Sequence, residues 1–136
     1  MKSVLVDSGF LVALGIGSDP RHRAALAFLR NYRGKLLVPE PVIIEACFFL
    51  STTGKVRLLD WVRRPPCVVN SVPASAYSEV AAILARYAGL DPDFTDAAIV
   101  WLADHTGCRF ILTVDVRDFS AFRLAKGRRF ELVKWA

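Results

Sequence analysis

The chain has 136 residues, of which 54% are hydrophobic and 23% are charged, a composition typical of one globular domain and not of a disordered segment. Its formal net charge of +5 favours phosphate-rich partners, although a basic face that only contacts water would give the same charge. The apolar runs are too short to span a bilayer and no secretory signal opens the chain, so we expect a soluble cytoplasmic protein without a membrane anchor.

The first predicted element is a strand that ends on an acid. Residues 4–6 form a continuous apolar run, as expected for a strand covered on both faces, and Ser8-Gly9 then provides a turn. Asp7 therefore stands at the carboxyl end of a buried strand. In open parallel sheets the ligand crevice lies outside these carboxyl ends.

Strands and helices then alternate along the chain. Asp or Pro marks the predicted helix starts and Gly most of the ends, whereas short β-branched or aromatic runs mark the strands. We expect Gly54 to end the helix that begins at Pro41. The predicted helices cover residues 20–33, 41–50, 56–62, 74–88, 94–106 and 118–124, and the later strands cover residues 35–38, 67–72, 109–114 and 130–134. This alternation predicts one α/β domain, residues 1–136, with a parallel sheet.

Four acids occupy settings that are unusual for a charged side chain. They are Asp7 and Asp115, each at the end of a strand, Glu45 inside an apolar helix, and Asp96 in the first turn of a later helix. Burying an unpaired carboxylate costs several kcal/mol, and no basic residue stands beside Asp7, Glu45 or Asp96 within these segments. A divalent cation is therefore the simplest partner. With only two histidines and three scattered cysteines, Mg²⁺ or Mn²⁺ fits better than zinc, and a disulfide framework is not expected.

Each acid also has a purely structural explanation. The alternatives are that Asp7 caps a helix starting at Ser8, that Asp96 forms a capping box with Asp93, that Glu45 pairs with a distant arginine, and that Asp115 is a turn residue before Asp118. All four explanations must hold together to account for the whole pattern. The joint arrangement therefore favours a common site over four separate structural roles.

Four motifs in this order resemble those of the PIN-domain ribonucleases. They read Val-Leu-Val-Asp-Ser-Gly-Phe near the start, Pro-Val-Ile-Ile-Glu inside a helix, Phe-Thr-Asp-Ala-Ala-Ile at the head of the late helix, and Leu-Thr-Val-Asp-Val-Arg-Asp-Phe near the end. The resemblance covers nearly the whole chain. Within that group, the length of the chain is similar to that of the VapC-type toxins of toxin–antitoxin pairs.

The resemblance implies a three-layer α/β/α fold with a central, mainly parallel sheet of four to five strands. It also implies a metal-dependent endoribonuclease that hydrolyses RNA phosphodiester bonds with Mg²⁺ or Mn²⁺. The catalytic and metal-binding residues would be Asp7, Glu45, Asp96 and Asp115, supported by Ser8 and Thr113, with Asp118 as an auxiliary acid or a helix cap. The implied partners are RNA, a cognate antitoxin protein and a second copy of the chain in a homodimer.

Other interpretations stay open at this point. Candidate RNA contacts are the basic residues near the last motif, Arg117, Arg123, Arg128 and Arg129, but these could simply contact solvent. A catalytically inactive PIN-like module that binds RNA or protein would keep the same fold. A phosphoryl-transfer domain with Asp7 as the nucleophile is disfavoured, because such sites usually pair two acids at the first strand and face a lysine.

Overall fold

A five-stranded sheet forms the centre of the computed structural model, which describes residues 1–136. In space its strands follow the order β3-β2-β1-β4-β5. Their bounds are β1 (Ser3–Val6), β2 (Lys35–Pro39), β3 (Cys67–Asn70), β4 (Phe110–Leu112) and β5 (Glu131–Leu132). Every neighbouring pair is parallel, so all five carboxyl ends lie along the same edge of the sheet. The predicted parallel α/β architecture is confirmed.

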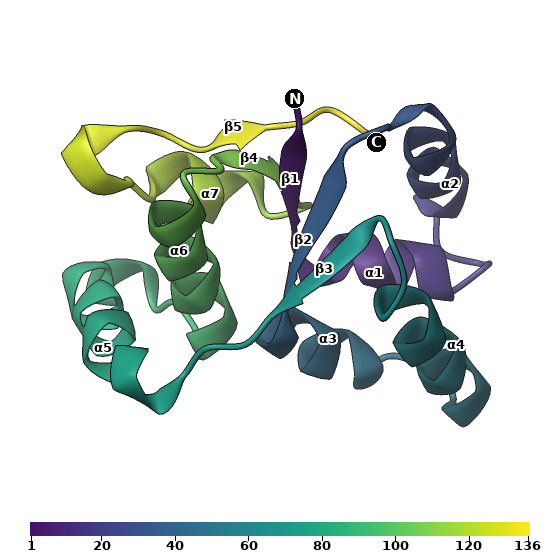
Figure 1. Ribbon diagram of the computed structural model, residues 1–136, viewed down its shortest axis with the longest axis horizontal. Coiled ribbons are helices and arrows are strands. Elements are labelled where there is room, and N and C mark those ends of the chain that lie inside the picture. The colour runs from purple at the N-terminus through teal and green to yellow at the C-terminus, as the bar shows by residue number, and fades with distance from the viewer.

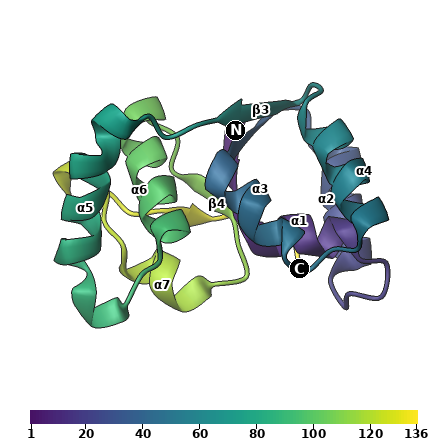
Figure 2. The same ribbon diagram turned by 90° about the horizontal axis from the view of Figure 1, so that it is seen from below.

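Helices cover both faces of this sheet. They are α1 (Ser8–Gly15), α2 (His22–Asn31), α3 (Glu40–Cys47), α4 (Thr52–Val62), α5 (Tyr77–Arg86), α6 (Phe94–Thr106) and α7 (Val116–Ala121), with 3₁₀ turns η1 (Ala74–Ala76), η2 (Ala88–Leu90) and η3 (Ala125–Gly127). In Figures 1 and 2, α5, α6 and α7 lie to one side of the strands and α1, α2 and α4 to the other. This arrangement is the expected three-layer α/β/α fold. None of the helices has the length and hydropathy that a membrane span requires.

The central strand and the longest helix supply the most deeply buried part of the core. Val4, Leu5 and Val6 of β1 are completely buried, as a strand between two helical layers must be. In α6 every residue from 97 to 103 is buried. Gly107 ends this helix with a positive φ of 74°, a backbone conformation that glycine adopts without strain. The predicted bounds of α6 are confirmed at both ends.

Several predicted helix boundaries differ from the structure, among them those of the helices predicted over residues 56–62, 74–88 and 118–124, and local side-chain hydrogen bonds account for two further differences. The helix predicted over residues 41–50 ends at Cys47, and Ser51 then caps α4 by accepting a hydrogen bond from the Gly54 backbone, 3.1 Å away. Gly54 thus lies in the first turn of a new helix. The helix predicted from residue 20 begins at His22, because the Asp19 side chain accepts from the Arg21 backbone and does not cap the helix.

The helix predicted over residues 41–50 has an apolar sequence and was expected to be buried, but three of its large apolar side chains are exposed. Ile44 is 55% exposed, and Phe48 and Phe49 are 80% and 64% exposed. The three cysteines are partly buried and free, as expected from their scattered positions. The face of α3 that points away from the sheet is therefore an apolar surface and not part of the core.

Candidate active site

One pocket at the carboxyl edge of the sheet brings all four predicted acids together. It has a volume of about 360 Å³ and contains Asp7, Glu45, Asp96 and Asp115 in its wall. These acids come from the β1–α1 junction, α3, the first turn of α6 and the segment after β4, which are far apart in the sequence. Asp19 and Asp93 line the same pocket. The joint arrangement favoured by the sequence is thus present in the fold.

Asp7 is the most deeply buried of these acids, with 6% of its surface exposed. It caps α1, since Oδ1 accepts a hydrogen bond of 2.8 Å from the Ser8 backbone. Oδ2 accepts a second bond of 2.7 Å from the Thr113 hydroxyl. The pKa of Asp7 is raised to about 6. Burial is the main cause, the two hydrogen bonds act in the opposite direction, and the charges of Glu45 and Asp115 also contribute to the rise. The ionised form of Asp7 is therefore disfavoured until a positive charge arrives.

Ser8 links this first acid to the second. Its hydroxyl donates a hydrogen bond of 2.5 Å to Oε1 of Glu45, across 37 residues of sequence. The ion pairs of the structure involve Asp60, Glu131 and Asp118, so Glu45 has no arginine or lysine partner. The hidden salt bridge considered for Glu45 is thereby excluded. The predicted supporting role of Ser8 agrees with this contact.

Asp96 combines a structural contact with a partly buried position in the pocket. Its backbone donates to Oδ1 of Asp93 at 2.8 Å, and its Oδ2 accepts from the Asp93 backbone at 3.2 Å, which completes a capping box for α6. The structural explanation of Asp96 is therefore correct, and its Oδ1 stays free of protein hydrogen bonds. Burial raises the pKa of Asp96 to about 7, with further contributions from the charges of Asp93, Asp7 and Asp115.

Asp115 lies further from its strand than predicted. β4 ends at Leu112, and Asp115 instead caps α7 by accepting from the Asp118 backbone at 3.1 Å. The hydroxyl of Thr113 accepts a hydrogen bond of 3.0 Å from the Asp115 backbone while it donates to Asp7. Thr113 thus connects two of the acids, as its expected supporting role requires. The alternative role of Asp118 as a helix cap is wrong, since it lies in the first turn of α7 and outside the pocket.

The pocket suits a hard divalent cation by its chemistry, although its side chains do not form a finished cage. Its potential ligands are carboxylate oxygens, which Mg²⁺ and Mn²⁺ prefer, and no lysine or arginine forms an ion pair with the four acids. No three histidine, cysteine or acidic side chains are arranged to hold one ion. The carboxylates bond to neighbouring hydroxyls and amides instead, so side-chain rotation would be needed to complete the geometry.

The basic residues predicted to contact RNA do not line this pocket. Arg117 is exposed beside Asp118, and the guanidinium of Arg123 donates to the carbonyl of Ser120 at 2.8 Å. Arg128 and Arg129 directly follow η3, whose Ala125 backbone donates to Asp104, near the opposite end of α6 from Asp96. Their role in RNA binding stays a prediction.

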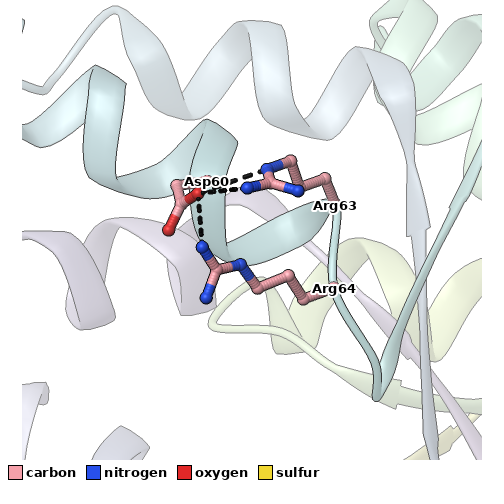
Figure 3. Close-up of polar contacts among 3 residues, drawn as sticks. All are labelled: Asp60, Arg63 and Arg64. Carbon is pink, nitrogen blue, oxygen red and sulfur yellow. Dashed lines mark hydrogen bonds and ion pairs between the residues drawn. The ribbon is translucent and has the colours of Figure 1, made fainter.

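Arg21 is the one basic side chain in the wall of the pocket, and the sequence did not single it out. It belongs to none of the four motifs, and only the α1–α2 loop carries it to the site. Asp19 was missed for the same reason, whereas Asp93 was noticed only as a possible cap. Arg21 forms no ion pair, whereas Arg63 and Arg64 both pair with the carboxylate of Asp60, with N to O distances of 3.0 and 2.9 Å (Figure 3).

Comparisons with known proteins agree with this geometry. A family model described as PIN domain matches residues 4–124. The chain is 27% identical over 134 residues to Ribonuclease VapC26 of Mycobacterium tuberculosis (strain ATCC 25618 / H37Rv), covering 96% of this chain and 99% of that protein. Its fold is similar to the crystal structure of M. tuberculosis VapC20, described as a Sarcin-Ricin loop cleaving toxin. The TM-score is 0.79 at 20% identity, and the match covers 87% of this chain and 94% of that one.

Proposed function

Since this chain belongs to the PIN domain family, we propose that it is a metal-dependent endoribonuclease of the VapC type, acting as the toxin of a toxin–antitoxin pair. The reaction would be hydrolysis of RNA phosphodiester bonds. The observation that carries the proposal is the single pocket in which acids from four separate elements meet without any basic partner in an ion pair.

In this proposal Asp7, Glu45 and Asp96 hold the principal Mg²⁺ or Mn²⁺, and Asp115 completes the cluster. When bound, the cation activates water for attack on the phosphorus and offsets the charge that develops on the phosphate. The chain supplies the positioning. Thr113 orients Oδ2 of Asp7, and Ser8 orients Glu45. Because protons and the cation compete for the same oxygens, cation binding would release the protons that the raised pKa values of Asp7 and Asp96 favour.

The proposal includes two protein partners, an antitoxin that blocks the pocket and a second copy of the chain. Exposed apolar side chains on the turn after α3 support such contacts, since Phe48 is 80% and Phe49 64% exposed, and Phe49 also lines the pocket. A protein that covers this surface would bury the two rings and close the mouth of the site. Nothing in the pocket favours a non-catalytic module over the enzyme.

The direct test is Asp96→Asn. Asparagine can still accept the hydrogen bond from the Asp93 backbone, so α6 keeps its cap while the pocket loses one carboxylate. We expect cleavage of total RNA in the presence of Mg²⁺ or Mn²⁺ to fall by at least about 100-fold, since removal of one group that stabilises the transition state typically costs this much.

Asp91→Asn is the matched control. Asp91 precedes the same helix, does not line the pocket, and has a φ of 49°, a left-handed conformation that asparagine tolerates well. This variant should cleave RNA like the wild type. Equal cleavage by Asp96→Asn and the wild type would reject the site assignment, and a wild-type protein that does not cleave RNA with either metal would favour the binding module.

A further inference from the structure

Arg21 lies where two pockets meet. It lines the acidic pocket, and it also lines a neighbouring pocket of about 290 Å³ between the segment after β4 and the C-terminal segment. Val114 is shared by both pockets as well, and the second one continues past Val116 to Lys134. The acidic pocket and its neighbour therefore share Arg21 and Val114 in their walls, and the neighbouring pocket contains a second basic side chain, Lys134.

The backbone of Arg21 is anchored on both sides. Its amide donates to Oδ1 of Asp19 at 2.8 Å, and the neighbouring His22 ring lies 2.8 Å from the carbonyl of Ala13 through Nδ1. These contacts tie the start of α2 to α1. Arg21 is consequently presented to the pocket at a defined position, although it stands in an exposed loop.

Its guanidinium, however, has no partner. No carboxylate lies within 4.0 Å of it, even though six acids line the same pocket, and it donates no side-chain hydrogen bond. Arg63 and Arg64 show the opposite situation, since both are occupied by Asp60 (Figure 3). The five donors of a free guanidinium form a planar fork that matches two oxygens of a phosphate.

The second pocket has a rigid wall. The indole of Trp135 donates to the Thr113 carbonyl at 3.4 Å and packs edge-on against Phe10, with ring centroids 4.9 Å apart. Val114 and Val116, which are 41% and 60% exposed, offer an apolar surface on the other side. Such a groove, apolar on its wall and basic at its ends, is suited to one nucleotide of a single strand, whose base needs an apolar contact and whose phosphate needs a cation.

We propose that Arg21 binds the phosphate next to the scissile one and directs the adjoining nucleotide into the pocket between Val114, Val116 and Lys134. This inference rests on RNA being the substrate. The six carboxylates around the pocket repel the phosphates of an RNA strand that enters it. Arg21 is the positively charged side chain that the protein itself places in this pocket. It would therefore determine how the strand lies across the acids.

The test uses Arg21→Ala and Arg21→Lys, with Arg23→Ala as the matched control. Arg23 is also exposed, lies two residues further along α2, and lines neither pocket. Each substitution is made in the otherwise wild-type chain, and the oligoribonucleotide carries nuclease-resistant phosphorothioate linkages, so that all four acids are kept and the strand is bound but not cut. Binding of a mixed-sequence, single-stranded oligoribonucleotide is measured in Mn²⁺ by fluorescence anisotropy at several salt concentrations.

We expect Arg21→Ala to weaken binding roughly tenfold and to reduce the slope of log Kd against log salt by about one, because one phosphate contact is lost. Arg21→Lys should restore the slope but only part of the affinity, since it keeps the charge without the fork. Lys134→Ala should reduce the slope in the same way. Arg23→Ala should change neither quantity, and identical binding by Arg21→Ala and Arg23→Ala would overturn the inference.

Two further measurements separate this inference from the nuclease proposal. In the otherwise wild-type chain, Arg21→Ala should raise KM for RNA and leave the Mn²⁺-induced rise in Tm at least as large as before. Loss of that rise would show that Arg21 acts on the acids and would overturn the inference. If no variant cleaves RNA but Arg21→Ala still weakens binding relative to Arg23→Ala, the nuclease proposal fails, whereas binding of an RNA phosphate by Arg21 is retained.

Discussion

At the scale of single residues, the site is defined by carboxylates that lack positive partners. The pKa of Asp7 is raised from its usual 3.8 to about 6, mainly by burial. The folded chain therefore binds a proton more tightly than the unfolded chain. The contribution of Asp7 to folding stability is fully present below about pH 4, and this contribution is lost as the pH rises towards 6. The raised pKa of Asp96 acts in the same direction up to about pH 7.

Asp7→Asn tests this argument in the presence of a chelator. A displacement from 3.8 to about 6 corresponds to about 3 kcal/mol, which the wild type should lose between acidic and neutral pH. The variant carries no charge at position 7, so its free energy of unfolding should fall less as the pH rises. At neutral pH this free energy should exceed that of the wild type, by an amount reduced by the cost of a weakened hydrogen bond to Thr113. Urea denaturation across this pH range measures both values. A parallel decline in the two proteins would contradict the argument.

The sequence revealed some site residues and not others, and the reason is local context. Asp7 and Glu45 are visible because a charged residue interrupts or ends an apolar run. Arg21 and Asp19 stand in a polar loop, where charged residues are expected, so nothing in the pattern distinguishes them. Their place in the pocket depends on how the α1–α2 loop returns to the sheet, and this path is set by contacts such as that between His22 and Ala13.

At the scale of elements, α6 shows how one helix end serves both stability and chemistry. Asp93 caps the helix, and through the reciprocal bond it fixes the side chain of Asp96. Its charge also raises the pKa of Asp96, after the effect of burial. The cap stabilises the helix, whereas the neighbouring negative charge opposes ionisation in the pocket.

The two effects of Asp93 can be separated by substitution. Asp93→Ala should lower the free energy of unfolding by about 1 kcal/mol, because the backbone of Asp96 loses its acceptor. Asp93→Ser keeps a capping oxygen without the charge and should recover most of this loss. Urea denaturation at neutral pH compares the three proteins. Equal losses in both variants would show that the charge, and not the cap, is the important property.

Elements whose ends are set locally were predicted well, and others were not. The bounds of α6 follow from Asp93 and Gly107, which act on their own neighbours in the chain. The end of α3 depends on competition between Ser51 as a cap for α4 and Gly54 as a stop for α3, and the glycine was given too much weight. β4 ends at Leu112, before the end of the predicted strand. Just after it, the Asp115 amide donates a hydrogen bond to the Thr113 hydroxyl in place of a neighbouring strand.

At the scale of the whole molecule, the parallel sheet is what collects the acids. All five strands end at one edge, so the junction after β1 and the segment after β4 converge although more than a hundred residues separate Asp7 from Asp115. The chain as a whole is basic, with a formal charge of +5, yet this pocket is strongly acidic. The basic exterior favours approach of RNA, while in the proposed mechanism a cation offsets the negative charge of the acidic pocket and so allows a phosphate to enter.

If the pocket binds a cation as proposed, the stability of the entire fold should depend on metal. A cation that binds only the folded chain at 100 times its Kd adds about 2.7 kcal/mol, roughly 8–10 °C in Tm for a domain of this size. Mn²⁺ should therefore raise the Tm of the wild type and a chelator should reverse the effect. Asp96→Asn should lose most of the shift, and Asp91→Asn, outside the pocket, should keep it. Since the acidic side chains are not already arranged around one ion, the shift should require more Mn²⁺ than a preformed site would. An equal rise in Asp96→Asn and the wild type would place the cation elsewhere on the molecule.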